Sequence, residues 1–197
     1  MKNIAIIPAR SGSKRLPGKN IKLINGKPLI AYSIKEAISS KIFDTVHLST
    51  DSAEYAEIGR KYGADVSFLR NVENASDKSS SWDMVEEVLL NFEKLGKYFD
   101  NFMLLQPTSP LRKANDIQNA FNLFANKNIN AVVSVCEIDN QINGAIYLSK
   151  TTHFFENNKN IYSSGCHYYI MDEMSSIDID TEDDFRSAAL IIMGEKN

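Results

Sequence analysis

The chain has 197 residues, of which 43% are hydrophobic and 24% charged, and its formal net charge is -3. This composition is typical of a globular protein and excludes a disordered, collagen-like or fibrous chain. The acidic balance, without a long Lys/Arg tract, argues against a nucleic-acid partner. No apolar run approaches the roughly 20 residues that a membrane-spanning helix requires, so no membrane partner is expected.

The first eight residues enter an apolar strand almost at once and show no small-residue cleavage site, so we expect no signal peptide. The two cysteines, Cys136 and Cys166, are too few for a disulfide framework and suit a reducing compartment. We therefore expect a cytoplasmic protein, large enough to fold around a core without a disulfide or a metal.

Short apolar runs alternate with longer amphipathic runs through the first two thirds of the chain. The predicted buried strands cover residues 4–7, 45–49, 102–105 and 131–135, because unbroken hydrophobicity suits a parallel strand covered on both faces. Predicted helices lie between them, around residues 30–38, 53–63, 81–95 and 114–125. This alternation predicts an α/β protein with a mostly parallel, doubly wound sheet between helical layers.

The alternation breaks after residue 138. Residues 143–148 and 168–171 are predicted strands, and residues 156–160 a polar loop or edge. The last helix is expected to begin at Thr181, with three acids in its first turn, where negative charge suits the helix dipole. Because no repeat or linker divides the chain, we predict one domain over residues 1–197 with a small excursion at 139–167.

A cationic loop follows the first strand. Residues 8–20, PARSGSKRLPGKN, carry four Lys/Arg side chains, two glycines, two serines and no acid. In an open α/β sheet, ligands bind at the carboxyl ends of the strands, where small residues admit phosphates and cations offset their charge. The loop is therefore predicted to bind an anion rather than to be merely solvated. The Walker A spacing and the GxGxxG pattern are both absent, which disfavours a P-loop kinase and a dinucleotide-dependent dehydrogenase.

The same loop carries a family resemblance. IIPARSGSK (residues 6–14), followed by Lys19 and Asn20, resembles the opening of the acylneuraminate cytidylyltransferases, the CMP-sialic acid synthetases. LLQPTSPLR (104–112), NGAIY (143–147) and SIDIDT (176–181) resemble three further stretches of that family, in the same order. The resemblance covers nearly the whole chain and implies the three-layer, Rossmann-like fold of nucleotide-diphospho-sugar transferases.

The resemblance implies a reaction in which CMP passes from CTP to the anomeric hydroxyl of a sialic acid, releasing pyrophosphate. Because a carboxylate-bearing sugar must approach a triphosphate, we expect catalysis by positioning and charge neutralisation. Two alternatives stay open: the same reaction on a legionaminic- or pseudaminic-type acid, and a CTP-binding module with weak or lost catalysis.

The resemblance also implies site residues. Arg10 and Lys19 are expected to contact the phosphates as catalytic residues. Substrate-binding roles fall to Ala9, Gly12, Ser13, Lys14 and Asn20 in the loop, to Arg70 and Ser81 near the cytosine and ribose, and to Gln106 at the sugar acid. The family usually has a proline after this arginine, whereas this chain has Asn71, which puts the turn through Arg70, Asp77 and Ser81 in question.

Two aspartates form the acidic counterpart of the loop. On a predicted strand, Ser176, Asp178 and Asp180 would point to one side. Two neighbouring carboxylates repel each other unless a cation or a proton intervenes, and oxygen ligands suit Mg²⁺. Asp178 and Asp180 also match the family's metal motif, so they are predicted to be catalytic and to hold one or two Mg²⁺ ions.

Several other reactive side chains are predicted to be structural. His47, His153 and His167 lack companions at metal-ligand spacing. Cys136 follows a strand core and is expected to be a buried thiol. Tyr147 is expected to pack rather than to stack on a base.

The chain departs from the family between residues 138 and 143. The family usually carries several tens of residues there, and they contribute to an extension that reaches a partner subunit's sugar site. Here residues 139–142 alone make the connection, which is a natural shortening, an engineered deletion or a gap in the sequence. The resemblance therefore implies a homodimer that the shortened segment weakens, with CTP and a sugar acid as ligands.

Overall fold

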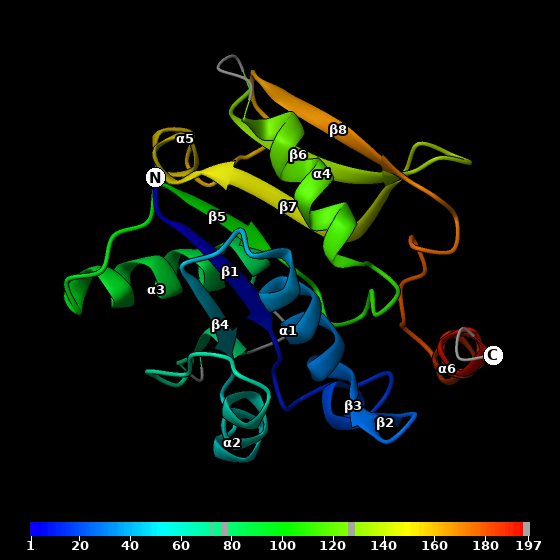
Figure 1. The fold of residues 1–197 in the computed structure, drawn as a ribbon. Helices are drawn as coiled ribbons and strands as arrows, with labels where there is room; N and C mark the ends of the chain where they lie inside the picture. The colour runs from blue at the N-terminus through cyan, green and yellow to red at the C-terminus, as the bar shows by residue number, and fades with distance from the viewer. Residues whose placement is uncertain (72, 76–78, 126–128, 195–197) are drawn as a thin grey trace.

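The computed structural model describes residues 1–71, 73–75, 79–125 and 129–194. A six-stranded sheet with the order β4-β1-β5-β7-β6-β8 forms its centre (Figure 1). The strands are β1 (Asn3–Pro8), β4 (Thr45–Ser49), β5 (Asn101–Leu104), β6 (Ala131–Cys136), β7 (Ile142–Lys150) and β8 (Cys166–Met171). β7 pairs antiparallel with β5 and β6, and the other pairings are parallel. The predicted mostly parallel sheet is confirmed.

The apolar runs form strands because both faces of the sheet are covered. In β1, Ala5 and Ile7 pack into one core cluster, while Ile4 and Ile6 pack into the cluster on the opposite face. All four side chains are inaccessible to solvent. Burying an aliphatic side chain of this size contributes roughly 1.5–3 kcal/mol to stability. This explains why residues 4–7 of the strand are all apolar instead of alternating between apolar and polar.

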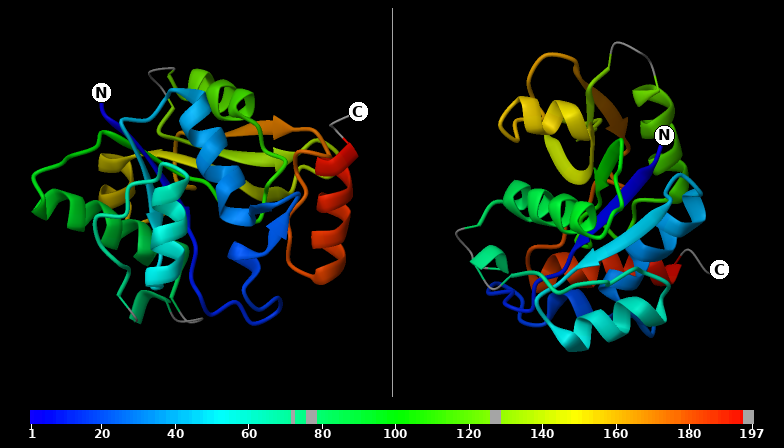
Figure 2. Two further views of the ribbon diagram at one scale, coloured as in Figure 1. Left: turned by 60° about the horizontal axis from the view of Figure 1, so that its bottom comes forward. Right: turned by 90° about the vertical axis from the view of Figure 1, so that its left-hand side faces the viewer.

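The helices form the outer layers. Figure 2 shows α3 (Ser81–Lys94) and α5 (Thr151–Glu156) on one side of the sheet, and α1 (Leu29–Ser40) and α4 (Ala114–Phe124) on the other. α2 (Ala53–Lys61) packs beside β4 on the α1 side. α6 (Glu182–Gly194) packs with the β2–β3 hairpin (Leu23–Ile24 and Lys27–Pro28) in a third, smaller cluster. Two short 3-10 helices, η1 (Lys19–Ile21) and η2 (Glu73–Ala75), complete the described elements.

The predicted helix boundaries agree closely with the structure, because capping residues mark them. The Ser52 hydroxyl accepts a hydrogen bond from the Tyr55 amide at the start of α2, and Ser80 forms a capping box with Asp83 at the start of α3. At the start of α6, Thr181 Oγ1 accepts from the Asp184 amide at 3.2 Å. α5 was not predicted, because its six residues are too few to show a helical period.

The predicted strand around residues 176–180 is wrong. Ser176 lies in a turn, and residues 177–180 have no regular structure. The segment crosses the ends of the strands instead of joining the sheet, and the Ile179 amide donates to the Thr108 carbonyl at 2.8 Å. The alternation of Asp178 and Asp180 therefore reflects an extended loop rather than a strand.

The short connection near residue 140 is a closed hairpin turn. The Cys136 amide donates to the Gln141 carbonyl, and the Asn140 amide donates to the Cys136 carbonyl, both at 2.9 Å. Asn140 takes the positive φ of 56° that such a tight turn requires, a conformation that asparagine tolerates well. Within residues 139–167, β7 therefore leads straight back into the sheet, between β5 and β6.

Candidate active site

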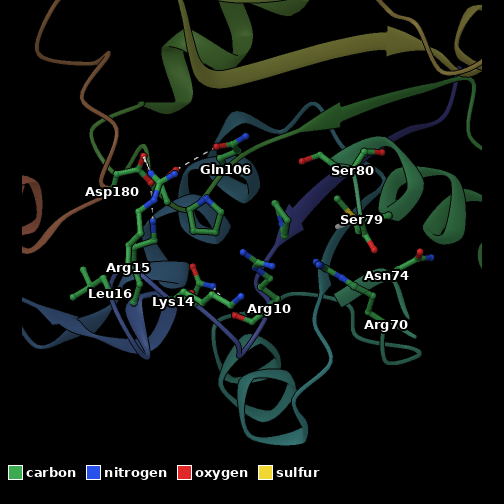
Figure 3. Close-up of a pocket in the computed structure, with 18 residues that line it drawn as sticks. Arg10, Lys14, Arg15, Leu16, Arg70, Asn74, Ser79, Ser80, Gln106 and Asp180 are labelled. Atoms are coloured by element: carbon green, nitrogen blue, oxygen red, sulfur yellow. Dashed lines mark hydrogen bonds and ion pairs between the residues drawn. The ribbon is translucent and has the colours of Figure 1, made fainter. Parts of the chain in front are cut away.

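A pocket of about 630 Å³ opens at the carboxyl ends of β1 and β5. Its walls come from the loop after β1, from Arg70, from the start of α3, from residues 106–108 and from the segment before α6 (Figure 3). This is the edge at which open α/β sheets bind their ligands. The lining residues are Pro8, Arg10, Ser13, Lys14, Arg15, Leu16, Lys19, Asn20, Arg70, Asn74, Ser79, Ser80, Ser81, Met84, Gln106, Pro107, Thr108 and Asp180.

Cations of the loop after β1 line one wall. The Asn20 side chain holds this loop in place, since its Nδ2 donates to the Arg10 carbonyl at 3.0 Å. Gly18 takes a φ of 67° at the start of η1, a conformation that glycine adopts without steric cost. Lys19 follows it, with a side chain only 12% exposed. The loop thus presents fixed positive charge to the pocket.

The segment before α6 meets this wall directly. Lys19 Nζ donates to the Ile179 carbonyl at 2.5 Å and lies 3.6 Å from Asp180 Oδ1. Arg15 Nη1 lies 2.5 Å from Asp180 Oδ2. The Arg15 and Asp180 side chains are 74% and 49% exposed, so their ion pair contributes at most about 1 kcal/mol. The contact nevertheless joins two segments that lie far apart in the sequence.

Asp178 lies beside Asp180. Protein atoms around its carboxyl restrict hydration and raise its pKa, and the negative charges of Asp180 and Asp184 raise it further. A hydrogen bond with Thr108 and the charge of Lys19 oppose this rise. Solvent still reaches the residue, so the loss of hydration is partial. Asp178 is thus a carboxylate whose charge is incompletely compensated within the protein.

Gln106 directs its side chain into the pocket from the end of β5 (Figure 3). Its Oε1 accepts a hydrogen bond from Thr108 Oγ1 at 3.3 Å. Gly144 in β7 faces it, with a φ of +76°, and a Cβ atom there would lie 3.3 Å from Gln106 Oε1. A glycine at this position therefore satisfies both the backbone conformation and the space that Gln106 occupies.

Arg70 forms the opposite wall. Only 8% of the residue is exposed, and it donates from Nε to Ser49 Oγ at 3.0 Å and from Nη2 to the Ser49 carbonyl at 2.6 Å. Burial lowers its pKa to about 10, so it stays charged at neutral pH. Arg70 is therefore an anchored cation and not a solvated surface residue. The Asn71 amide donates to Glu87 Oε1 at 2.8 Å, a hydrogen bond that a proline in that position cannot make.

The family described as "Cytidylyltransferase" matches residues 4–184. The chain belongs to the cytidylyltransferase family. The resemblance seen in the sequence motifs is confirmed.

Relatives of this cytidylyltransferase carry names that concern several acidic sugars. It is 35% identical to the "CMP-N,N'-diacetyllegionaminic acid synthase" of Legionella pneumophila, over 94% of both chains. It is 35% identical to the "N-acylneuraminate cytidylyltransferase" of Escherichia coli, over 100% of this chain but 53% of the relative. It is 37% identical to the "Pseudaminic acid cytidylyltransferase" of Campylobacter jejuni, over 83% of this chain and 71% of the relative.

The solved structures support the fold of this cytidylyltransferase. It superposes on a "CMP:2-keto-3-deoxy-manno-octonic acid synthetase complexed with CTP" with a TM-score of 0.78 at 16% identity, covering 99% of this chain and 100% of that one. The alignment with the Legionella relative spans 218 positions although this chain has 197 residues. The relative therefore has segments that this cytidylyltransferase lacks.

The described residues fit a magnesium ion that takes part of its ligands from a bound substrate. They contain no group of three or more His, Cys, Asp or Glu side chains that is able to hold a metal. Mg²⁺ is commonly held by one or two carboxylates, with water and substrate phosphates as its other ligands. Asp178 and Asp180 supply such a pair. Restricted hydration is the main cause of the raised pKa of Asp178, and the nearby charge of Asp180 adds to it, a repulsion that a bound cation would relieve. The site therefore fits Mg²⁺ together with a phosphate, rather than a metal held by the protein alone.

Most of the predicted site residues line the pocket, and three do not. Ala9 is fully buried, with its amide donating to the Ser49 carbonyl at 2.9 Å. Gly12 is exposed, and a Cβ atom there would contact nothing within 4 Å. Asp178 lies next to the lining residues Thr108 and Asp180 without being one of them. Asp77 lies outside the described residues.

Sequence reasoning gave no role to several lining residues. Arg15 belongs to the cationic loop, which is the signal that could have identified it. Ser79 and Ser80 come just before a predicted helix start, where unpaired backbone amides and serine hydroxyls lie close together. Thr108 belongs to the motif that contains Gln106. Only the folded structure places these residues in one pocket, because they come from segments that lie far apart in the sequence.

The residues predicted to be structural lie away from the pocket lining. His47 and His153 are buried, while His167 is exposed on β8. Tyr147 packs edge-on against Trp82, with ring centroids 5.6 Å apart. Cys136 is only partly buried, so the prediction of a buried thiol is wrong, because the residue ends β6 at the hairpin turn.

Proposed function

We propose that this cytidylyltransferase transfers CMP from CTP to the anomeric hydroxyl of a nonulosonic acid and releases pyrophosphate, with Mg²⁺ as cofactor. One observation carries the proposal: the cations Arg10 and Lys19 share a pocket with Asp180, which lies beside Asp178. A pocket lined by cations, with a carboxylate pair at its edge, suits a triphosphate that binds together with a metal ion. The names of the relatives support the choice of substrates.

In this proposal the loop after β1 binds the triphosphate. Arg10, Lys14 and Lys19 offset its charge, and Asn20 holds the loop closed. Arg70 and Ser81 receive the cytosine and ribose end. Lys19 and Arg15 exchange part of their contact with Asp180 for phosphate oxygens, which frees carboxylate oxygens for a cation. Bound Mg²⁺ would neutralise charge on the phosphates and polarise them.

The sugar acid enters beside Gln106 and Thr108. The anomeric oxygen forms a bond to the α-phosphorus, the bond from that phosphorus to the bridging oxygen breaks, and pyrophosphate leaves with the electron pair. The hydroxyl proton is released. The protein contributes orientation and charge neutralisation, which together account for large rate effects without a covalent nucleophile.

A second candidate is a CTP-binding module with weak or lost catalysis. The missing segments in the alignment with the Legionella relative favour it, as does the tight turn near residue 140. A shorter chain with a tight turn at this point has less material with which to build a second substrate site, whereas the residues of the cationic loop line the pocket. The identity of the acid is part of the same question, because relatives are named for legionaminic, neuraminic and pseudaminic acids.

We further propose a cytoplasmic homodimer formed through the β8 edge. Ile142, Tyr168 and Ile170 share one face of the sheet through their cross-strand partners, and they are 44%, 62% and 60% exposed. Tyr168 and Ile170 lie on the edge strand β8, and an exposed apolar patch that reaches a sheet edge favours association. Sedimentation would report a dimer if this is correct.

No helix among the described residues has the length and apolarity to cross a membrane.

Pyrophosphate release tests the function. The protein is incubated with CTP, Mg²⁺ and, in separate reactions, sialic, legionaminic and pseudaminic acids, with UTP replacing CTP as the control. Release with CTP and one of these acids is expected. CTP binding by calorimetry without any release would favour the binding module. Absence of both would contradict the proposed function.

A further inference from the structure

Arg112, at the end of the LLQPTSPLR stretch, has a nearly fully buried side chain next to the Gln106 loop. Only 1% of the residue is exposed. Its Nη1 donates to the Gln106 carbonyl at 3.1 Å and to the Ala145 carbonyl at 2.7 Å. Its Nη2 donates to Ser33 Oγ at 2.6 Å. One guanidinium therefore ties together the end of β5, strand β7 and helix α1.

The cost of this arrangement argues for a role beyond packing. All three acceptors of Arg112 are uncharged, and no salt bridge to it exists among the described residues. Its Nε has no hydrogen-bond partner among the residues that the structure describes. The charges of Asp116 and Glu36 offset part of the burial, but neither carboxylate forms a salt bridge with the guanidinium in the described structure. Burying a cation without a directly paired carboxylate is expensive, and an apolar side chain would fill the space at lower cost. Burial lowers the pKa of Arg112 to about 10, so the charge persists at neutral pH.

The three contacts converge on the seat of the Gln106 side chain. The Gln106 carbonyl accepts from Arg112 and also from Ser33 Oγ, at 3.2 Å. The Ala145 carbonyl belongs to the residue after Gly144, the glycine that faces Gln106 Oε1. Arg112 therefore holds both the backbone that carries Gln106 and the strand against which its side chain lies. With its backbone carbonyl fixed in this way, Gln106 keeps its side-chain amide at the pocket, where Oε1 also accepts a hydrogen bond from Thr108 Oγ1.

We propose that Arg112 is a positioning residue for the sugar-acid half of the site, and that it acts by fixing Gln106 against β7. This inference rests on the proposed function. The guanidinium suits the task because its rigid, planar fork reaches several acceptors at once. A lysine keeps the charge but presents a single ammonium, and it cannot hold three divergent acceptors in the same geometry.

The test uses Arg112→Lys and Ser33→Ala in the full chain, with Arg60→Lys as the matched control. Arg60 also donates to a backbone carbonyl, that of Val66 at 2.8 Å, but α2 contributes no residue to the described lining. Pyrophosphate release is measured against sugar acid at saturating CTP, and against CTP at saturating sugar acid, below each variant's unfolding midpoint. Amide exchange of peptides covering 104–112 and 143–147 is measured in parallel.

For Arg112→Lys we expect the KM for the sugar acid to rise about tenfold, because the contact between Gln106 and the sugar acid is misplaced. The KM for CTP should change less than about twofold. Ser33→Ala should raise the first KM by about threefold, because Arg112 then keeps two of its acceptors. Exchange should quicken in both peptides in Arg112→Lys. Arg60→Lys should change none of these quantities.

Equal rises of both KM values, or normal kinetics in Arg112→Lys, would overturn the inference, since charge or packing alone would then suffice. If Arg112→Lys does not fold, an unchanged KM for the sugar acid in Ser33→Ala overturns it. A wild-type protein without turnover on any acid would instead refute the proposed function. In that case unchanged exchange in Arg112→Lys still overturns the positioning role, and faster exchange supports it.

Discussion

At the scale of single residues, Asp180 is where the two charged segments of the site meet. It contacts Arg15 and Lys19 from the loop after β1 and lies beside Asp178. Asp180→Asn keeps the shape of the side chain but removes a negative charge that a divalent cation needs. We expect turnover to fall by at least about 10²-fold without a change in the unfolding midpoint. Magnesium titrations of initial rate will measure this.

Asp183→Asn is the matched control, because Asp183 lies three residues further on, is 92% exposed and pairs only with Arg186 among its described contacts. It should keep wild-type turnover. A normal magnesium response in Asp180→Asn would remove that residue from the site.

Lys19 is an anchored cation of the loop, with a 12% exposed side chain that reaches the Ile179 carbonyl. Lys19→Ala should raise the KM for CTP by roughly tenfold or more, because a charge-assisted phosphate contact is lost. Lys94→Ala, at the far end of α3, serves as the control. If both variants respond to CTP as the wild type does, Lys19 binds no phosphate.

At the scale of elements, the sequence predicted the strands and helices well because burial on both faces and capping residues leave local signals. Residues 45–49 formed a strand with the predicted bounds, and α3 begins at the predicted Ser81. The prediction of a strand at 177–180 is wrong, since an alternating pattern looks the same in an extended loop as in a strand.

The pocket was predictable only in part, for the same reason. Arg10, Lys19 and Asp180 belong to motifs that stand out along the chain, so sequence reasoning singled them out. Thr108 and Arg112 act through contacts with the distant Ile179 and Ala145, and no local pattern encodes those contacts. A local pattern also does not encode which residues of a basic loop face the pocket. Ala9 and Gly12 were predicted to bind substrate, but Ala9 is buried and Gly12 is exposed outside the pocket lining.

Strand β7 offers a prediction at this scale. Gly144→Ala places a Cβ 3.3 Å from Gln106 Oε1 and forces a non-glycine residue to a φ of +76°. We expect a loss of roughly 1–2 kcal/mol in unfolding free energy from the backbone alone. The displaced Gln106 should also raise the KM for the sugar acid. Urea unfolding and steady-state kinetics check both.

Gly96→Ala is its control, because Gly96 has a φ of +74° with nothing within 4 Å of the added Cβ. It should show a similar loss of stability and normal kinetics. Normal sugar-acid kinetics in Gly144→Ala as well would show that Gly144 is not part of the Gln106 seat.

At the scale of the whole molecule, we expect stability to depend on pH through a buried histidine in the core. His47 on β4 is fully buried between Phe68 and Phe92. Its Nδ1 lies 3.5 Å from Asp65 Oδ1, and neither ring nitrogen makes a hydrogen bond within the described part of the chain. Burial lowers the pKa of His47, while the contact with His47 lowers the pKa of Asp65 to about 2.

Both folded-state pKa values lie below the unfolded ones, so the unfolded chain takes up protons that the native state refuses. Stability should therefore be full above about pH 6.5 and fall as the pH drops, first through His47 and then, below about pH 4, through Asp65. The raised pKa of Asp178 acts in the opposite sense near pH 4, so pH 5–7.5 is the informative range.

Urea midpoints of the wild type and of His47→Phe check this prediction. The phenylalanine keeps an aromatic ring between Phe68 and Phe92, and it should flatten the dependence between pH 7.5 and pH 5. An equal slope in both proteins would assign the acid sensitivity to other groups.

A crystal structure with CTP and Mg²⁺ bound would decide whether the two charged segments form a nucleotide site. We expect the triphosphate between the loop after β1 and the segment before α6, contacted by Arg10 and Lys19, with the metal held by Asp178, Asp180 and phosphate oxygens. CTP bound elsewhere, or a metal that touches neither aspartate, would contradict it.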